Sequence, residues 1–394
     1  MDLLSKLENK RDKKREVHFF DYSLLIVVLF LVGFGLIMIY SASSYEAKLS
    51  FDNAAYYLRK QAIAAGLGIF VMLGVSFIPY KLYGKISSII YISAGLILLI
   101  MLKIPGISYS ANGATRWIRL FGGFTLQPAE VIKIIIIFVY AKLLESYSWL
   151  AKKWNGTLVL AVIALAFSGL VYLISDNLSS AIIIFLIALT MSFVACKDKK
   201  WLAIYSGSVA FIGAAAVLII LKFGQDSWGF RFRRILAWVH PENYSDDTSF
   251  QTLQSLYAIG SGGVFGKGLG ESMQKLNYIP EAQNDMIFSI IVEELGLIGG
   301  ICVLILFGIL LYRMLVIASN TDDPYGALLV TGIMAHFAIQ VILNIAVVTN
   351  TIPNTGISLP FISYGGSSVL FLLTEIGIVL NVGRNISFKN PKSE

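Results

Sequence analysis

Asp285 is a candidate for a side chain that accepts a proton. It closes the stretch Tyr278–Asp285, which reads Tyr-Ile-Pro-Glu-Ala-Gln-Asn-Asp, and a long apolar run begins directly after it. A carboxylate at the edge of an apolar segment can be partly desolvated, which raises its pKa and its basicity. A second interpretation is an ordinary carboxylate at a helix N-terminus, stabilised by the helix dipole. Residue types alone favour the second interpretation.

Glu130 and Lys133 form another candidate group, inside the apolar run that follows Gln127. They are i,i+3 neighbours on one face of the expected helix, where opposite charges can neutralise each other. An ionisable residue inside a membrane span costs about 2.5–3.5 kcal/mol on insertion scales, so it is a candidate for function. The pair is either a structural ion pair or part of a polar cavity that opens outward. Just upstream, Arg116 has forked donors that suit phosphate or pyrophosphate oxygens.

Further arginines and hydroxyl groups gather in two other segments. Arg231, Arg233 and Arg234 could attract a pyrophosphate or an anionic lipid head group, or anchor the chain to lipid phosphates. Pro353–Ser368 joins two apolar runs, yet it carries prolines, glycines and a row of hydroxyls. Because unpaired backbone in lipid costs several kcal/mol per group, this segment is expected at the membrane boundary or lining a polar cavity.

The apolar runs that position these residues predict a polytopic membrane protein. The 394-residue chain is 57% hydrophobic and only 14% charged, whereas about a quarter of the residues in soluble domains are charged. Runs of roughly 17–25 residues can span a bilayer as helices. The sequence predicts an all-α integral membrane protein with about ten such spans, at 23–43, 61–79, 86–103, 128–146, 157–174, 178–196, 202–222, 286–312, 326–348 and 366–384.

Lysines and arginines predict the orientation of these spans. They are concentrated in the segment before the first span and in every second connection thereafter. Although Lys48, Arg59 and Lys60 run against this trend, the basic N-terminal segment outweighs them, so the positive-inside rule places both termini in the cytoplasm. Residues 1–22 are then a basic cytoplasmic segment, 23–384 the transmembrane domain and 385–394 a cytoplasmic tail. Residues 223–285 form one large external loop between the seventh and eighth spans, with helix-like stretches such as Thr252–Ile259. Topology therefore explains the net charge of +7, without a nucleic-acid partner.

The order of the residues in four segments resembles the SEDS family (shape, elongation, division and sporulation), the FtsW/RodA/SpoVE polymerases of the bacterial cell wall. The similar segments are Asn112–Trp117, Gln127–Lys133, Tyr278–Gly296 and Pro353–Ser368, the last preceded by Gln340-Val341 and Asn344. The resemblance covers nearly the whole chain and is greater to the FtsW/SpoVE branch than to RodA. Asn177-Leu-Ser-Ser departs from the family, in which an Asp-Leu-Gly-Thr-like run occupies this place.

The resemblance implies a peptidoglycan glycosyltransferase in the bacterial cytoplasmic membrane. It would polymerise lipid II, the undecaprenyl-pyrophosphate-linked disaccharide-pentapeptide, at the outer face during cell division or sporulation. Asp285 would be the catalytic residue and a class B penicillin-binding protein the transpeptidase partner. A divalent cation could assist, although no dedicated ligand cage is visible. The substrate-binding residues would be Arg116, Glu130, Lys133, Arg234, Asn344, Ser363, Gly365 and Gly366.

Other functions stay open at this point. A lipid II flippase would also need buried charges and broken helices, but related halves, its distinguishing feature, are not found. A RodA-type elongation polymerase and a noncatalytic division scaffold are further alternatives. The glycine-rich run Gly262–Gly268 lacks the Ser/Thr that a phosphate-binding P-loop requires. His18, His240 and His336 are too dispersed for a metal site.

Overall fold

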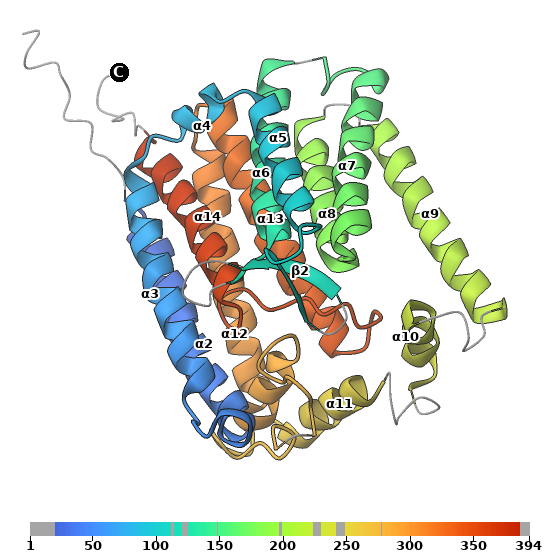
Figure 1. Ribbon diagram of the computed structural model, residues 1–394. Coiled ribbons are helices and arrows are strands. Elements are labelled where there is room, and N and C mark those ends of the chain that lie inside the picture. The colour runs from blue at the N-terminus through green and yellow to red at the C-terminus, as the bar shows by residue number, and fades with distance from the viewer. Residues whose placement is uncertain are drawn as a thin grey trace, which may run out of the picture.

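The structure is a computed structural model that describes residues 20–386, apart from 112–113, 120–124, 148, 197–198, 224–229, 242–248 and 277. Its helices, drawn in Figure 1, are α2 (Tyr22–Phe51), α3 (Tyr56–Phe77), α4 (Lys81–Lys85), α5 (Ser88–Met101), α6 (Pro128–Ser146), α7 (Trp154–Ser175), α8 (Leu178–Ala195), α9 (Lys199–Phe223), α10 (Phe230–Val239), α11 (Phe250–Gly262), α12 (Ile287–Ser319), α13 (Pro324–Val348) and α14 (Gly366–Arg384). The strands β1 (Ser108–Ala111), β2 (Ala114–Arg119) and β3 (Thr125–Leu126) pair antiparallel in that order.

The predicted class, a polytopic helical membrane protein, is confirmed. Among the described residues, seven helices are long and apolar enough to cross a membrane, namely α2, α3, α7, α8, α12, α13 and α14. The other three predicted spans coincide with α5, an apolar helix of 14 residues, with α6, which carries two ion pairs, and with α9. The total of ten spans therefore stays a prediction. The small sheet between α5 and α6 was not predicted.

The packing of α2 against α12 fixes which ends of the bundle lie together. Near the start of α2, Asp21 accepts hydrogen bonds from Arg313 in the second half of α12, with an Nη2–Oδ2 distance of 2.7 Å. Further along α2, Ser41 donates to Glu294 in the first half of α12. The two helices are therefore antiparallel. Gly383, near the end of α14, lies beside Ile317, near the end of α12. The start of the first span and the end of the last span therefore lie at the same end of the bundle.

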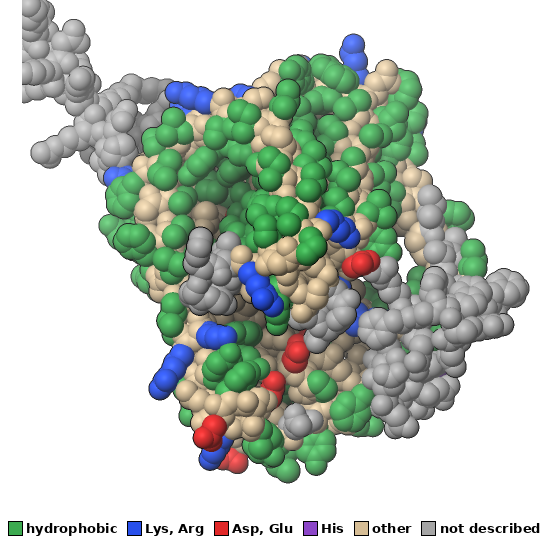
Figure 2. Space-filling view, in the orientation of Figure 1, with side chains coloured by type: hydrophobic (Ala, Val, Ile, Leu, Met, Phe, Trp, Pro, Cys, Tyr) green, Lys and Arg blue, Asp and Glu red, His purple; other side chains and the backbone are tan. Residues whose placement is uncertain are grey.

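The surface agrees with a membrane-embedded bundle. Figure 2 shows a face dominated by hydrophobic side chains, with basic side chains along its upper rim and both acidic and basic ones in its lower half. The helices α10 and α11 lie at the lower end, opposite α4 (Figure 1). The start of α2 and the end of α14 lie at one end of the bundle, and α10 and α11 lie at the other (Figure 1). This arrangement fits the predicted topology, but sidedness in a membrane stays a prediction. Residues 1–19, 387–394 and Asp246 lie outside the described residues.

The helices α13 and α14 form the centre of the bundle. The most apolar stretches of α13 and α14 are 61% and 67% buried, against 28% for α7 and for α12. A helix buried on most of its circumference can carry polar side chains only where other protein groups satisfy them. The buried polar residues of these two helices, among them His336, Gln340, Asn344, Glu375 and Asn381, therefore face protein rather than lipid.

A break in α12 ties the segment between α11 and α12 to the bundle. Gly296 has φ 72° inside the helix, and the backbone groups around it pair with the segment after α11: Lys267 N donates to Glu293 O and Leu297 N to Gly263 O, both at 2.9 Å. The fully buried carboxylates of Glu293 and Glu294 bind the ammonium groups of Lys267 and Lys275 at 2.6 and 2.8 Å, respectively. Part of the glycine-rich run noted in the sequence thus packs against the start of α12.

Candidate functional site

Asp285 lies in the turn directly before α12 and is held from two sides. Its Oδ1 accepts a hydrogen bond of 3.3 Å from Gln251 Nε2 of α11, and its backbone carbonyl accepts one of 2.8 Å from Asn344 Nδ2 of α13. Asn344 Nδ2 also donates to Ile357 O at 2.7 Å. The side chain of Asp285 is half-buried. Two helices and the segment after α13 therefore hold one carboxylate at the end of the bundle where α10 and α11 lie (Figure 1).

Burial raises the pKa of Asp285 from 3.8 to about 6. Desolvation is the largest cause, because it penalises the charged form. The negative charge of Glu281 adds to the increase, whereas Arg234 and the hydrogen bond from Gln251 oppose it. A carboxyl group with a pKa near 6 is ionised at neutral pH and is a stronger base than an ordinary aspartate. This is the property expected of a general base.

Arg234 is brought to this carboxylate by α10. Its Nη1 donates to Asn354 O at 3.1 Å, and Asn354 Nδ2 donates to Gln251 Oε1 at 3.1 Å. The neighbouring Trp238 donates from Nε1 to Asn350 O at 3.0 Å. The helix α10 is thus attached to the segment after α13, and a positive charge lies near Asp285. The structure describes no side chains for the other two arginines of the cluster.

Glu130 and Lys133 form the predicted ion pair in the first turns of α6. Their side chains are buried, with Lys133 Nζ 2.8 Å from Glu130 Oε1, and Glu130 Oε2 accepts a hydrogen bond of 3.4 Å from Ser368 Oγ. Ser367 donates to the carbonyl of Thr125. The start of α14 therefore lies against the pair. These contacts suit both a structural role and a wall of the site.

Ser363, Gly365 and Gly366 belong to the turn that leads into α14. Ser363 Oγ accepts from Leu359 N at 2.7 Å, and Gln61 of α3 contacts the carbonyl of Ser363 and the amide of Gly365, at 3.3 and 3.1 Å. The hydroxyl of Ser363 thus stabilises the turn, and the Cβ of Ala64 lies close to the backbone at Gly366. These residues shape the segment beside the ion pair.

Arg116 reaches the site from the small sheet. Its Nη2 donates to Asp176 O at 2.9 Å, in the turn between α7 and α8. Asn177 caps α8, because its Oδ1 accepts from Ser180 N at 3.0 Å, and Ser179 donates to the carbonyl of Thr355. A chain of contacts therefore links Arg116 to the segment that surrounds Asp285. Asn177, where the sequence departs from the family, acts here as a helix cap.

The structure thus gathers the predicted residues along one segment, 353–368. Asp285, Arg234 and Asn344 lie around its first half, and Glu130 and Lys133 lie beside its end. Sequence reasoning missed two residues of the site. Gln251 contacts the carboxylate of Asp285 directly, and Asn354 contacts Gln251. Asn354 lies within the stretch singled out in the sequence, whereas nothing in the sequence distinguishes Gln251 from other polar residues of the loop.

The donors near Asp285 do not form a metal-ligand set. Within the described parts of the chain, no group of three or more His, Cys, Asp and Glu side chains is placed to hold a metal ion. Glu281, the carboxylate nearest in sequence, is exposed and accepts a hydrogen bond of 2.8 Å from Asn284 Nδ2.

Comparison with known proteins establishes the family. The family described as "Cell cycle protein", which groups FtsW, RodA and SpoVE, matches residues 22–387, so this chain belongs to it. Stage V sporulation protein E of Bacillus subtilis is 36% identical over 364 residues, which are 92% of this chain and 97% of that protein. A probable peptidoglycan glycosyltransferase FtsW of Geobacter metallireducens is 38% identical over 368 residues, 93% of this chain and 96% of that protein.

Solved structures share the fold. A chain of a peptidoglycan synthase complex, from work on the coordination of polymerization and crosslinking, has a TM-score of 0.75 at 24% identity and covers 93% of this chain and 98% of its own length. RodA of Thermus thermophilus has a TM-score of 0.63 at 24% identity, with coverages of 94% and 98%. The predicted family is confirmed, and several relatives bear the name of the predicted enzyme class.

Proposed function

We propose that this chain is a peptidoglycan glycosyltransferase that polymerises lipid II at the outer face of the cytoplasmic membrane, together with a class B penicillin-binding protein. The observation that carries the proposal is the half-buried Asp285, whose pKa is raised to about 6 and whose backbone and side chain are held by Asn344 and Gln251. Family membership supplies the reaction class. The chain's own residues supply the roles that follow.

Asp285 would act as the general base. It takes the proton from the 4-hydroxyl of the acceptor sugar as that oxygen attacks the anomeric carbon of the donor. A new carbon–oxygen bond forms, and the bond from the anomeric carbon to the pyrophosphate oxygen breaks. The leaving group departs with the electron pair as undecaprenyl pyrophosphate, and its negative charge is stabilised by cationic groups such as Arg234 and Arg116.

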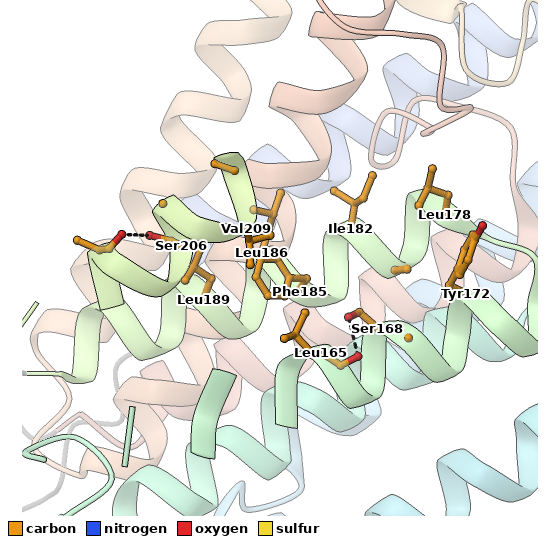
Figure 3. Close-up of a pocket in the computed structure, with 15 residues that line it drawn as sticks. Leu165, Ser168, Tyr172, Leu178, Ile182, Phe185, Leu186, Leu189, Ser206 and Val209 are labelled. Carbon is orange, nitrogen blue, oxygen red and sulfur yellow. Dashed lines mark hydrogen bonds between the residues drawn. The ribbon is translucent and has the colours of Figure 1, made fainter. Parts of the chain in front are cut away.

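An apolar groove offers room for the lipid part of such a substrate. It has a volume of about 730 Å³ and lies between α7, α8 and α9. Figure 3 shows Tyr172 and Leu178 at one end of the groove, with Phe185, Leu186 and Val209 further along it. Tyr172 and Leu178 flank the turn whose carbonyl binds Arg116. A pyrophosphate at Arg116 could therefore extend its polyprenyl chain along the groove while its sugars reach the external segment.

The test measures glycan chain formation from purified lipid II by the purified protein with its transpeptidase partner. Wild-type protein should form chains, and Asp285→Asn should reduce the rate by at least about 10²-fold, because an amide cannot act as a general base. The matched control is Asp322→Asn, which neutralises an exposed carboxylate between α12 and α13. Chain formation by Asp285→Asn at the wild-type rate would remove Asp285 as the base, whereas a folded wild-type protein that forms no chains would favour the flippase alternative.

A further inference from the structure

A buried polar pair joins α13 to α14 at the middle of both helices. His336 Nδ1 lies 3.1 and 2.9 Å from the two carboxyl oxygens of Glu375, and the two side chains are 1% and 0% exposed. At these distances the imidazole and the carboxyl group are joined by a hydrogen bond. Neither residue belongs to the site described above, and the proposed reaction uses neither.

His336 is aligned with two residues that do reach the site. His336, Gln340 and Asn344 are spaced by four residues, so they share one face of α13, and all three are at most 2% exposed. Gln340 Nε2 donates to Ser358 O at 2.9 Å, and Asn344 Nδ2 holds Asp285 O and Ile357 O. On this polar face of α13, Asn344, which binds the backbone of Asp285, lies about 12 Å from His336 along the helix axis.

The pair is not arranged for stability alone. His336 Nε2 has no hydrogen-bond partner among the described residues, and two apolar side chains of similar size would pack without that unsatisfied atom. Buried ionisable pairs of this kind are commonly neutral or unfavourable for stability compared with apolar replacements. Their best-supported benefit is register, because sliding or rotating one helix would leave a buried carboxyl group without its partner.

We infer that His336 and Glu375 are positioning residues that fix the register of α13 against α14 and thereby hold Asn344 against the Asp285 turn. The inference deepens the proposed function, because it concerns the placement of the proposed base. The far end of α14 is fixed separately, since Asn381 binds Tyr80 N and Ser76 O, both at 2.8 Å. The register of α14 is thus anchored to the rest of the bundle, and the pair transmits it to α13.

The decisive variant replaces the pair by apolar residues, His336→Leu with Glu375→Leu, which removes the register signal without leaving a buried charge. The protein should fold, but amide hydrogen exchange in peptides covering 281–289 and 353–363 should become at least about tenfold faster. Because misplacement by about 1 Å can cost 10²-fold in rate, the kcat for lipid II polymerisation should fall by about 10–10²-fold. The KM should change little, because the pair does not touch substrate.

Two further variants separate register from simple loss of polarity. The exchanged pair, His336→Glu with Glu375→His, keeps the interhelical contact and should restore most of the exchange protection and the rate. Thr331→Val with Thr374→Val is the matched control on the same helices, because each of these hydroxyls bonds only within its own helix. It should leave the exchange of the Asp285 turn and the polymerisation rate unchanged.

Wild-type exchange rates at the Asp285 turn and a wild-type kcat in the folded double-leucine protein would overturn the inference. If that protein does not fold, Glu375→Leu alone supplies the same test, because the leucine cannot form the hydrogen bond to His336. Unchanged exchange and unchanged kcat in that variant would be equally negative. The exchange measurement needs no lipid II. If the wild-type protein formed no glycan, the proposed function would be refuted, but the exchange rates would still decide whether the pair positions the Asp285 turn.

Discussion

Replacing Asp285 by Asn should make the protein more stable at neutral pH while it slows catalysis by at least about 10²-fold. The folded structure raises the pKa of Asp285 from 3.8 to about 6, chiefly by desolvation. A shift of roughly two pKa units corresponds to about 3 kcal/mol of preference for the uncharged form. Because the side chain is half-buried, water screens part of this term, and about 1–3 kcal/mol is expected. The Asn side chain avoids this cost and still accepts the hydrogen bond from Gln251.

The sign of this effect determines its pH dependence. The folded protein binds the proton of Asp285 more tightly than the unfolded chain, so the contribution to stability is complete below pH 4 and is lost as the pH rises through about 6. Variant and wild type should therefore be equally stable below about pH 4, diverge between pH 4 and pH 6, and differ by a constant amount above pH 6. The polymerisation rate of the wild type should run the other way and fall about tenfold per pH unit below pH 6, because only the ionised carboxylate accepts a proton.

The assay is thermal unfolding of both proteins in one detergent from pH 4 to pH 8, compared as a difference so that other titrating groups cancel. Asp322→Asn serves as the control, because it neutralises an exposed carboxylate and should show no such divergence. An Asp285→Asn protein that is less stable than wild type at pH 7, or equally stable throughout, would refute the desolvation argument. A rate that is constant between pH 5 and pH 7 would refute the role of a base with this pKa.

Three further outcomes are expected. The exchanged pair Glu130→Lys with Lys133→Glu should fold and insert but form little glycan if the pair lines the site, and near-normal polymerisation would limit the pair to a structural role. A reporter fused after Lys200 should be cytoplasmic and one inserted at Asp246 external, and the same sidedness for both would contradict the ten-span topology. Gly356→Ala should destabilise the protein by about 1 kcal/mol, because φ is 69° at this position, and a variant of unchanged thermal stability would contradict that backbone strain.

Local rules predicted the parts of the fold that depend on neighbouring residues. Periodic apolar runs placed helices at all ten expected ranges, because a membrane span must satisfy its own backbone. The i,i+3 spacing of Glu130 and Lys133 predicted an ion pair that the structure contains. Thr252–Ile259 was identified as helix-like within the external loop and falls inside α11. Each of these features is determined within a few turns of one helix.

The contacts of the site were not accessible in the same way. The partner of Arg116 is a backbone carbonyl 60 residues away, and the contact of Gln251 with Asp285 joins residues that are 34 apart. Such contacts depend on how helices pack, which the periodicity of one helix does not specify. The sequence gives no role to His336, because the three histidines are too dispersed for a metal site. Its partner Glu375 lies 39 residues further on. Only the three-dimensional structure reveals that the two meet.

The position of Asp285 reconciles two requirements that oppose each other. A general base for a sugar hydroxyl gains strength from desolvation, yet a carboxylate deep in the apolar bundle would stay protonated or need a cationic partner, as Glu130 and Lys133 need each other. At the turn before α12, Asp285 is desolvated enough for a pKa of about 6 and remains ionised at pH 7. A lipid-linked substrate fits the same boundary, because its apolar chain can stay in the membrane while its sugars reach that carboxylate.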